Sequence, residues 1–177
     1  MATTLTEVCS DVATEPQISV NTATNSLPEE RKQLDIRARG FWGGQLEAAF
    51  FDVRVFNPFA ASAITIPVPQ LYRRHEQEKR RKYEQRLQEE NYSFTPLVFS
   101  TSGGASKLTT RFLQHLASKL SDKKFGKYAQ ALCWLRTRLA FTIARAGSMC
   151  LRACRSRRAH PSMAVDPVSA LSAAKLI

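Results

Sequence analysis

The sequence lacks several patterns that would decide its class at once. Its four cysteines, Cys9, Cys133, Cys150 and Cys154, match no zinc-binding spacing. Cys150 and Cys154 are four residues apart, so a metal site there would need further ligands from elsewhere in the chain. The sequence has no internal repeat, and its start lacks the basic-then-apolar order of a secretory signal. We therefore expect free thiols in a reducing intracellular compartment, nuclear or cytoplasmic, and no secretion.

An uncharged apolar run long enough to cross a membrane is also missing. The most apolar stretch is "ALCWLRTRLAFTIARAGSMCLRAC", residues 131–154. Four arginines interrupt it: Arg136, Arg138, Arg145 and Arg152. Because burying four guanidinium groups in hydrocarbon would cost too much free energy, we expect no transmembrane helix and no membrane partner.

Acidic residues are scarce outside the first 30 positions. The chain has 26 Lys+Arg against 15 Asp+Glu, a net charge of +11. Residues 1–30 hold five of the acids and no Lys or Arg, so the remainder carries 26 basic residues against ten acids, an excess of sixteen. Such an excess favours a polyanionic partner, and nucleic acid is the commonest. A merely soluble basic protein is the alternative.

A length of 177 residues suits one domain with a hydrophobic core. Residue periodicity predicts an α/β fold in which helices cover a small mixed β-sheet. We expect residues 1–158 to form this domain and residues 159–177 to be a disordered or loosely packed tail. The expected elements are a helix over 2–14, a short strand within 16–20, strands over 33–39 and 48–56 joined by a Gly-rich turn, a charged helix over 71–91, a strand from 93 to about 100, and helices over 106–120 and 123–158.

The strand expected over residues 48–56, "AAFFDVRVF", carries a carboxylate near its centre. One face of the strand is wholly apolar and should pack on the core: Ala49, Phe51, Val53 and Val55. The opposite face is mixed: Phe50, Asp52, Arg54 and Phe56. A partly exposed ion pair between Asp52 and Arg54, which would contribute little stability, is one interpretation of that face.

Asp35 offers a second interpretation. A hairpin of the two strands brings Asp35 beside Asp52, and two neighbouring carboxylates repel each other unless a cation lies between them. Mg²⁺ binds one or two carboxylates, keeps several waters and accepts phosphate oxygens. In phosphodiester cleavage such an ion activates a water and offsets charge on the transition state. The pattern predicts a Mg²⁺ site at Asp35 and Asp52. Arg54 would be a phosphate clamp, because arginine does not deprotonate.

This arrangement resembles the PD-(D/E)XK, or restriction-like, nuclease family. In that family an Asp on one strand precedes an acidic-x-Lys tripeptide on the next, within an α-β-β-β-α-β core. Asp35 matches the first acid and Asp52-Val53-Arg54 matches the tripeptide, with Arg at the Lys position. The resemblance implies a restriction-endonuclease-like core with additional C-terminal helices.

Five segments carry a closer resemblance: "LDIRARGFWGG", "AFFDVRVFNP", "YRRHEQEKRRKYEQR", "SFTPLVFSTSGG" and "LCWLRTRLAFTIARA". In this order they are similar to the region that follows reverse transcriptase in certain animal retrotransposon polyproteins. There the region is thought to be a restriction-like endonuclease that nicks target DNA. The resemblance implies Mg²⁺-dependent cleavage with Asp35 and Asp52 as metal ligands and Arg54 as the third signature residue. A catalytically inactive basic nucleic-acid-binding module and a nonfunctional mobile-element remnant are the alternatives.

Relatives of this kind carry more sequence before the "LTEVC" segment, including residues that help to build the site. The resemblance therefore implies an N-terminally truncated and incomplete site. Glu7 is the candidate to replace the missing acid. The resemblance implies no small-molecule cofactor.

Two segments are rich in Lys and Arg. Residues 73–82, "RRHEQEKRRK", hold six basic residues and two acids, and residues 122–158 hold ten basic residues and one acid. A solvated helix and a phosphate-contacting surface explain the first segment equally well. The expected partner is nucleic acid, DNA above all. The candidate nucleic-acid-binding residues are Arg73, Arg74, Lys79, Arg80, Arg81, Lys82, Arg152, Arg155, Arg157 and Arg158.

Three smaller features complete the predictions. The helix over 71–91 has a single inward stripe: Leu71, Tyr72, His75, Lys79, Tyr83 and Leu87. Residues 100–104, "STSGG", favour a plain strand-to-helix turn over an anion-binding loop, because the full phosphate-loop pattern is missing. Phe41 and Trp42 are assigned to the core, with base contact as the alternative, and Trp134 and Phe141 are assigned to packing.

Overall fold

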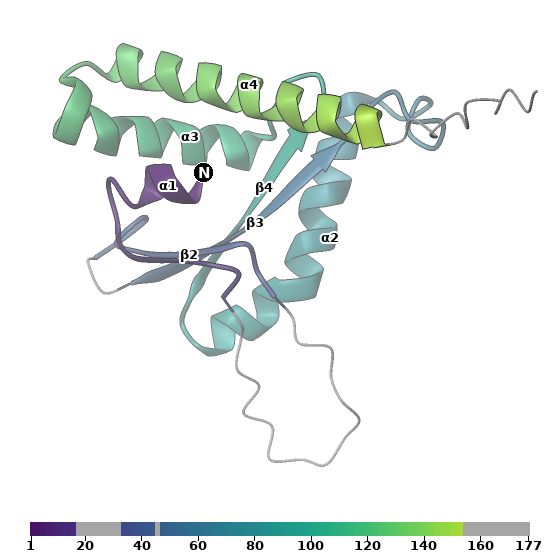
Figure 1. Ribbon diagram of the computed structural model, residues 1–177. Helices are drawn as coiled ribbons and strands as arrows, with labels where there is room; N and C mark the ends of the chain where they lie inside the picture. The colour runs from purple at the N-terminus through teal and green to yellow at the C-terminus, as the bar shows by residue number, and fades with distance from the viewer. Residues whose placement is uncertain (17–32, 45–46, 154–177) are drawn as a thin grey trace, which may run out of the picture.

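The computed structural model of the chain describes residues 1–16, 33–44 and 47–153 (Figure 1). It is a mixed α/β fold, as the sequence predicts. The elements in chain order are α1 (Ala2–Leu5), β1 (Ser10–Thr14), β2 (Ile36–Arg39), β3 (Ala48–Phe56), α2 (Val68–Glu89), β4 (Ser93–Ser100), α3 (Lys107–Leu120), the π-helical turn η1 (Ser121–Phe125) and α4 (Tyr128–Ala153).

The four strands form one mixed sheet in the order β1-β2-β3-β4. The pairs β1–β2 and β2–β3 are antiparallel, whereas β3 and β4 are parallel. The hairpin register places Ile36 opposite Phe51 and Arg39 opposite Ala48. Helix α2 makes the crossover that a parallel β3–β4 pair requires.

One face of the sheet holds the main hydrophobic core. Helices α1, α3 and α4 lie on this face (Figure 1). At its centre Phe51 of β3 packs edge-on against Phe112 of α3, and both are fully buried. The predicted core face of β3 is therefore confirmed at Ala49 and Phe51, while Val55 at the strand end remains 47% exposed.

The other face is covered by α2 and holds two smaller apolar clusters. The inward stripe predicted for this helix is confirmed, because Leu71, Tyr83 and Leu87 are buried. The first cluster consists of Leu34, Ala48, Phe50, Tyr83 and Leu87. The second consists of Phe56, Ala63, Leu71 and Val98. Asp52 lies on β3 between Phe50 of the first cluster and Phe56 of the second.

The predicted helix over residues 2–14 is wrong in its second half. The helix ends at Leu5, and Ser10–Thr14 form β1, which pairs with β2. Cross-strand hydrogen bonds with β2, which a local pattern does not reveal, outweigh the helical spacing of a short segment. The strand predicted within 16–20 falls almost wholly outside the described residues.

The long helix predicted from residue 123 begins later than expected. Gly126 has a φ of 63°, in the left-handed region that glycine adopts most readily, and it separates η1 from α4. The second half of α4 extends beyond α3 (Figure 1). Phe141 is consequently 73% exposed, so its assignment to packing is wrong. Within the ranges described, no helix has the length and apolar content needed to span a bilayer.

Replacing Phe51 by Ala tests where the core lies. Phe51 is fully buried and contacts both Phe41 and Phe112, so Phe51→Ala should lower the free energy of unfolding by about 3–5 kcal/mol. Phe141→Ala on the exposed part of α4 is the control and should change it by less than about 0.5 kcal/mol. Urea unfolding followed by circular dichroism measures both. Equal effects would contradict this placement of the core.

Candidate functional site

Asp52 lies in the middle of β3 with only 4% of its surface exposed. Its partner is Lys79 of α2, whose Nζ is 2.5 Å from Asp52 Oδ2. The Lys79 side chain is itself only 18% exposed. A buried ion pair therefore joins the centre of the sheet to the helix that covers it.

Helical spacing explains why Lys79 reaches Asp52. Lys79 follows the buried Leu71 by eight residues and precedes the buried Tyr83 by four, so all three share the face of α2 that meets the sheet. Its long side chain runs between the two apolar clusters, and its Nζ lies 5.9 Å from the centre of the Tyr83 ring. The apolar stem packs while the ammonium meets the carboxylate.

Asp35 lies beside Asp52, but not on a strand. The residue forms a bend immediately before β2, which corrects the prediction that it lies within a strand over residues 33–39. Asp35 Oδ2 accepts a hydrogen bond of 2.6 Å from the backbone N–H of Val53. Continuing the antiparallel register by one residue places Asp35 opposite Asp52. The two predicted metal ligands are therefore neighbours.

The surroundings of Asp52 raise the pKa of its carboxyl group above the ordinary value. Burial is the largest cause, and the charge of Asp35 acts in the same direction. The hydrogen bond and charge of Lys79 oppose them, without cancelling the effect of burial. The ionised form of Asp52 is thus held in the fold at a cost in stability, which is typical of residues at functional sites.

Arg54 does not pair with Asp52. Arg54 is exposed, and the ion pair within the strand is a wrong interpretation because Lys79 occupies the carboxylate instead. Arg54 lies near His75 of α2, whose pKa is lowered first by burial and then by the charge of Arg54. His75 Nδ1 is 3.7 Å from Glu78 Oε2. Arg54 and His75 therefore form a partly polar rim next to the buried pair.

Lys79 is the site residue whose role sequence reasoning missed. The inward stripe includes it, yet it is also assigned to a nucleic-acid surface. Its position in the inward stripe could have predicted the pair, because a lysine on the buried face of a helix requires an anionic partner in the element that the helix covers.

The other basic candidates are spread over the surface. Arg73, Arg74, Arg81 and Lys82 are exposed on α2. Arg80 is half-buried and pairs with Glu84 at 3.4 Å, one helical turn away. Arg152 is exposed near the end of α4. Arg155, Arg157 and Arg158 lie outside the described residues.

Glu7 does not join the carboxylates as proposed. Its Oε2 pairs instead with Nζ of Lys124 in η1, at 3.1 Å. In residues 1–16, 33–44 and 47–153, no group of three or more His, Cys, Asp and Glu side chains is placed to hold a metal ion. Any metal here would have two protein carboxylates, Asp35 and Asp52, as its ligands.

The turn over residues 100–104 is a plain strand-to-helix connection. The N–H of Gly103 donates to the carbonyl of Ser100, and the N–H of Gly104 donates to Ser100 Oγ. Because these donors are satisfied within the turn, they do not form an anion-binding loop.

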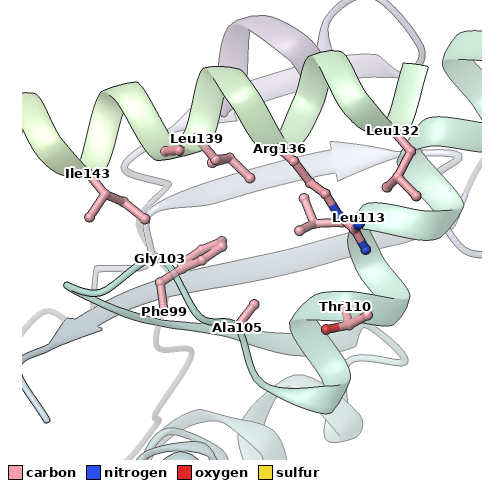
Figure 2. Close-up of a pocket in the computed structure, with 10 residues that line it drawn as sticks. Phe99, Gly103, Ala105, Thr110, Leu113, Leu132, Arg136, Leu139 and Ile143 are labelled. Atoms are coloured by element: carbon pink, nitrogen blue, oxygen red, sulfur yellow. The ribbon is translucent and has the colours of Figure 1, made fainter. Parts of the chain in front are cut away.

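A separate cavity of about 380 Å³ lies between α3, α4 and the β4–α3 turn (Figure 2). Phe99, Leu113 and Ile143 contribute to its mostly apolar wall. The side chain of Arg136 extends from α4 toward Leu113 of α3. No acid is among the residues that line this cavity. It lies on the face of the sheet opposite Asp52, so it adds no carboxylate to the candidate site.

Comparisons with known proteins give no family assignment. No protein-family model matches the chain, and neither the curated proteins nor the solved structures contain a match. The function is therefore inferred from the geometry of Asp35, Asp52 and Lys79 and from the resemblance to restriction-like nucleases.

Asp52→Asn tests the stability cost of the buried charge. Because the pKa of Asp52 is raised by folding, this group lowers the free energy of unfolding as the pH rises from the unfolded pKa, about 3.9, through the higher folded pKa. As the pH rises from 4 to 8, the unfolding midpoint of Asp52→Asn should therefore increase relative to that of the natural chain. Thermal unfolding across this range measures it, with Asp122→Asn in η1 as a surface control. A shift in the opposite direction would contradict the dominance of burial.

Lys79→Met tests the ion pair itself. Removing the ammonium leaves a buried carboxylate without its partner, so the variant should lose about 3 kcal/mol of unfolding free energy at pH 7. Adding Asp52→Asn to this variant should restore most of the loss, because no unpaired charge then remains. A double-mutant cycle by urea unfolding gives the coupling energy. Additive effects would show that the two side chains do not interact.

Proposed function

We propose that this chain is an endonuclease-like nucleic-acid-binding domain of retrotransposon type, which cleaves DNA phosphodiester bonds with Mg²⁺. One observation carries the proposal: Asp52 pairs with the Lys79 ammonium, and Asp35, which binds the N–H of the next residue, Val53, is close enough for its charge to raise the pKa of Asp52. Two acids and a lysine are the residue types that the PD-(D/E)XK pattern requires. In this chain the lysine comes from α2 instead of the position held by Arg54.

The donor set is compatible with Mg²⁺. Asp35 Oδ2 binds the Val53 N–H and Asp52 Oδ2 meets Lys79. In each carboxylate the contact just described is made by the Oδ2 atom. Mg²⁺ commonly uses one or two carboxylates and completes its shell with water and phosphate oxygens. When bound, the ion would supply an activated water and offset negative charge on the phosphate.

The remaining work falls to the chain's own cations. Lys79 Nζ is placed to neutralise charge beside Asp52 whenever that carboxylate is ionised. It can also offset charge on a phosphate that approaches the carboxylates. Arg54, exposed on the same face of β3, offers a planar guanidinium to an adjacent phosphate oxygen. Its permanent charge suits holding a phosphate and not proton transfer.

The arrangement of elements supports the same proposal. The order α1-β1-β2-β3-α2-β4, followed by α3 and α4, is the α-β-β-β-α-β order of the restriction-like core with two further helices. One acid comes from β3, as in the family pattern, and the other from the residue just before β2, where the pattern has an acid within the strand. The basic surface of α2, with Arg73, Arg74 and Arg81 exposed, provides a region for contacts with the phosphate backbone.

A second candidate function is that of a catalytically silent nucleic-acid-binding module. The observation that favours it is the burial of the site: Asp52 is 4% exposed and its charge is already met by Lys79. To receive a metal ion, Asp52 would need the Lys79 ammonium to move aside. A chain that keeps this pair closed would bind nucleic acid through its basic surface without cleaving it.

A plasmid-nicking assay separates the two functions. We expect supercoiled DNA to be nicked with Mg²⁺ or Mn²⁺ and not with EDTA. Asp52→Asn should reduce nicking to background, because it removes one of the two carboxylate ligands. Asp122→Asn, a change of the same chemistry on the surface, should nick as the natural chain does.

Binding is measured in parallel, in EDTA and over a range of salt concentrations. Both functions predict affinity that falls steeply with salt and is unaffected by Asp52→Asn. Equal nicking by the natural chain and by Asp52→Asn would reject catalysis at this site. Binding that is insensitive to salt would reject the nucleic-acid-binding function as well.

A further inference from the structure

A basic pocket lies at the end of the molecule where the β2–β3 turn meets α3. It has a volume of about 410 Å³. Three cationic side chains line it: Arg39 from the end of β2, Lys119 from the last turn of α3 and Lys123 from η1. Its remaining lining residues are Val8, Cys9, Ser10 and Gly40, none of them acidic.

Two of these cations are held by contacts within the fold. Lys119 Nζ donates a hydrogen bond of 3.0 Å to the carbonyl of Gly40, which ties α3 to the turn. Arg39 Nε lies 3.1 Å from Asp11 Oδ2. The charges of Lys119 and Lys123 also reach Cys9, where they lower the pKa of the thiol against a larger rise caused by burial. Arg37 shares Asp11 with Arg39, so one carboxylate serves two guanidinium groups.

The turn that contributes Gly40 to the pocket also carries an aromatic residue, Trp42. Trp42 follows Gly40 by two residues, which span at most about 7 Å. Its ring stacks on His115 of α3 with a centroid separation of 5.0 Å, and its Nε1–H donates to Thr95 Oγ1. His115 Nε2 in turn donates to the Phe41 carbonyl at 2.6 Å. Trp42 remains 36% exposed, so a rigidly oriented indole presents surface to solvent.

From this juxtaposition we propose that the pocket binds a backbone phosphate of single-stranded nucleic acid, with a neighbouring base stacked on Trp42. A cation cluster without a lining acid suits a phosphate, and an aromatic ring beside it suits an unpaired base. Bases in a duplex are already stacked on each other and would not reach the ring. Because Trp42 is held by His115 and Thr95, little side-chain entropy is lost on stacking.

The inference rests on the nucleic-acid-binding part of the proposed function and adds a second contact area to it. The pocket is built from β1, the β2–β3 turn, α3 and η1, whereas Lys79 approaches Asp52 from α2 on the other face of the sheet. A strand bound at the pocket would be held apart from the carboxylates. The site would therefore anchor an unpaired strand while other DNA meets α2.

The test uses the full chain with Trp134→Phe, so that Trp42 is the single tryptophan. A fluorescein-labelled oligo(dT) is titrated in EDTA between 50 and 200 mM salt, and anisotropy and Trp42 emission are recorded together. We expect Trp42 emission to be quenched on saturation. A duplex of the same length should bind without this quenching.

Lys123→Gln removes one of the pocket cations. It should weaken oligo(dT) binding about fivefold at 100 mM salt and reduce the slope of log affinity against log salt by about 0.7. The matched control is Lys107→Gln, which also removes one positive charge. Lys107 is at the first turn of α3, about 18 Å along the helix from Lys119, so this variant should have a smaller effect on the affinity and on the salt slope. Trp42→Leu should weaken binding by roughly tenfold. Its thermal midpoint is measured to confirm that it folds.

The possible outcomes are distinct. Equal effects of Lys123→Gln and Lys107→Gln, or unchanged Trp42 emission at saturation, would overturn the pocket and leave the nicking proposal intact. Loss of nicking in all forms, with quenching and the Lys123 effect present, would reject catalysis and support the pocket. No binding of oligo(dT) with duplex binding retained would overturn the pocket alone, whereas no binding of either form at any salt concentration would overturn the nucleic-acid-binding function as well.

Discussion

The buried pair of Asp52 and Lys79 is the interaction on which the α2 face of this structure depends. Asp52 is in the centre of β3, and the helix that covers it must supply a cation or leave a charge unpaired in an apolar setting. Lys79 does so without disturbing the packing on either side, because Leu71 and Tyr83 of the same stripe fill the two clusters. The same ion pair therefore fixes the position of α2 over the sheet and sets the charge at the candidate site.

The two faces of the sheet differ in polarity at the centre of β3. On the α3 side, β3 contributes Phe51 to an apolar core with ring contacts to Phe41 and Phe112. On the α2 side, the next residue along the strand is an acid whose burial raises its pKa. A purely structural strand would gain from an apolar residue at that position. The apolar face provides the stability that allows the charged face to hold a costly arrangement.

Local sequence predicted the elements whose signal is local. The strand over 48–56 alternates two faces between a Gly-rich turn and a proline, and β3 has those bounds. The inward stripe of α2 was predictable for the same reason. β1 was not, because five residues with mixed character become a strand only through pairing with β2. The proximity of Asp35 and Asp52 was predictable from the hairpin. The Asp52–Lys79 pair was not, because it depends on which turn of α2 crosses which residue of β3. Helix periodicity does not contain that information.

Several basic side chains of the chain are already paired with acids inside the fold. Lys79 neutralises an internal carboxylate, Lys124 pairs with Glu7, and Arg37 and Arg39 share Asp11, so these side chains contribute to the fold before any partner binds. Net charge alone therefore overstates the surface available to a polyanion. What distinguishes the pocket between the β2–β3 turn and α3 is that its cations outnumber the acid paired with them and that the same turn carries an oriented indole, Trp42. Electrostatic attraction there acts together with stacking, and that combination favours an unpaired strand over a duplex.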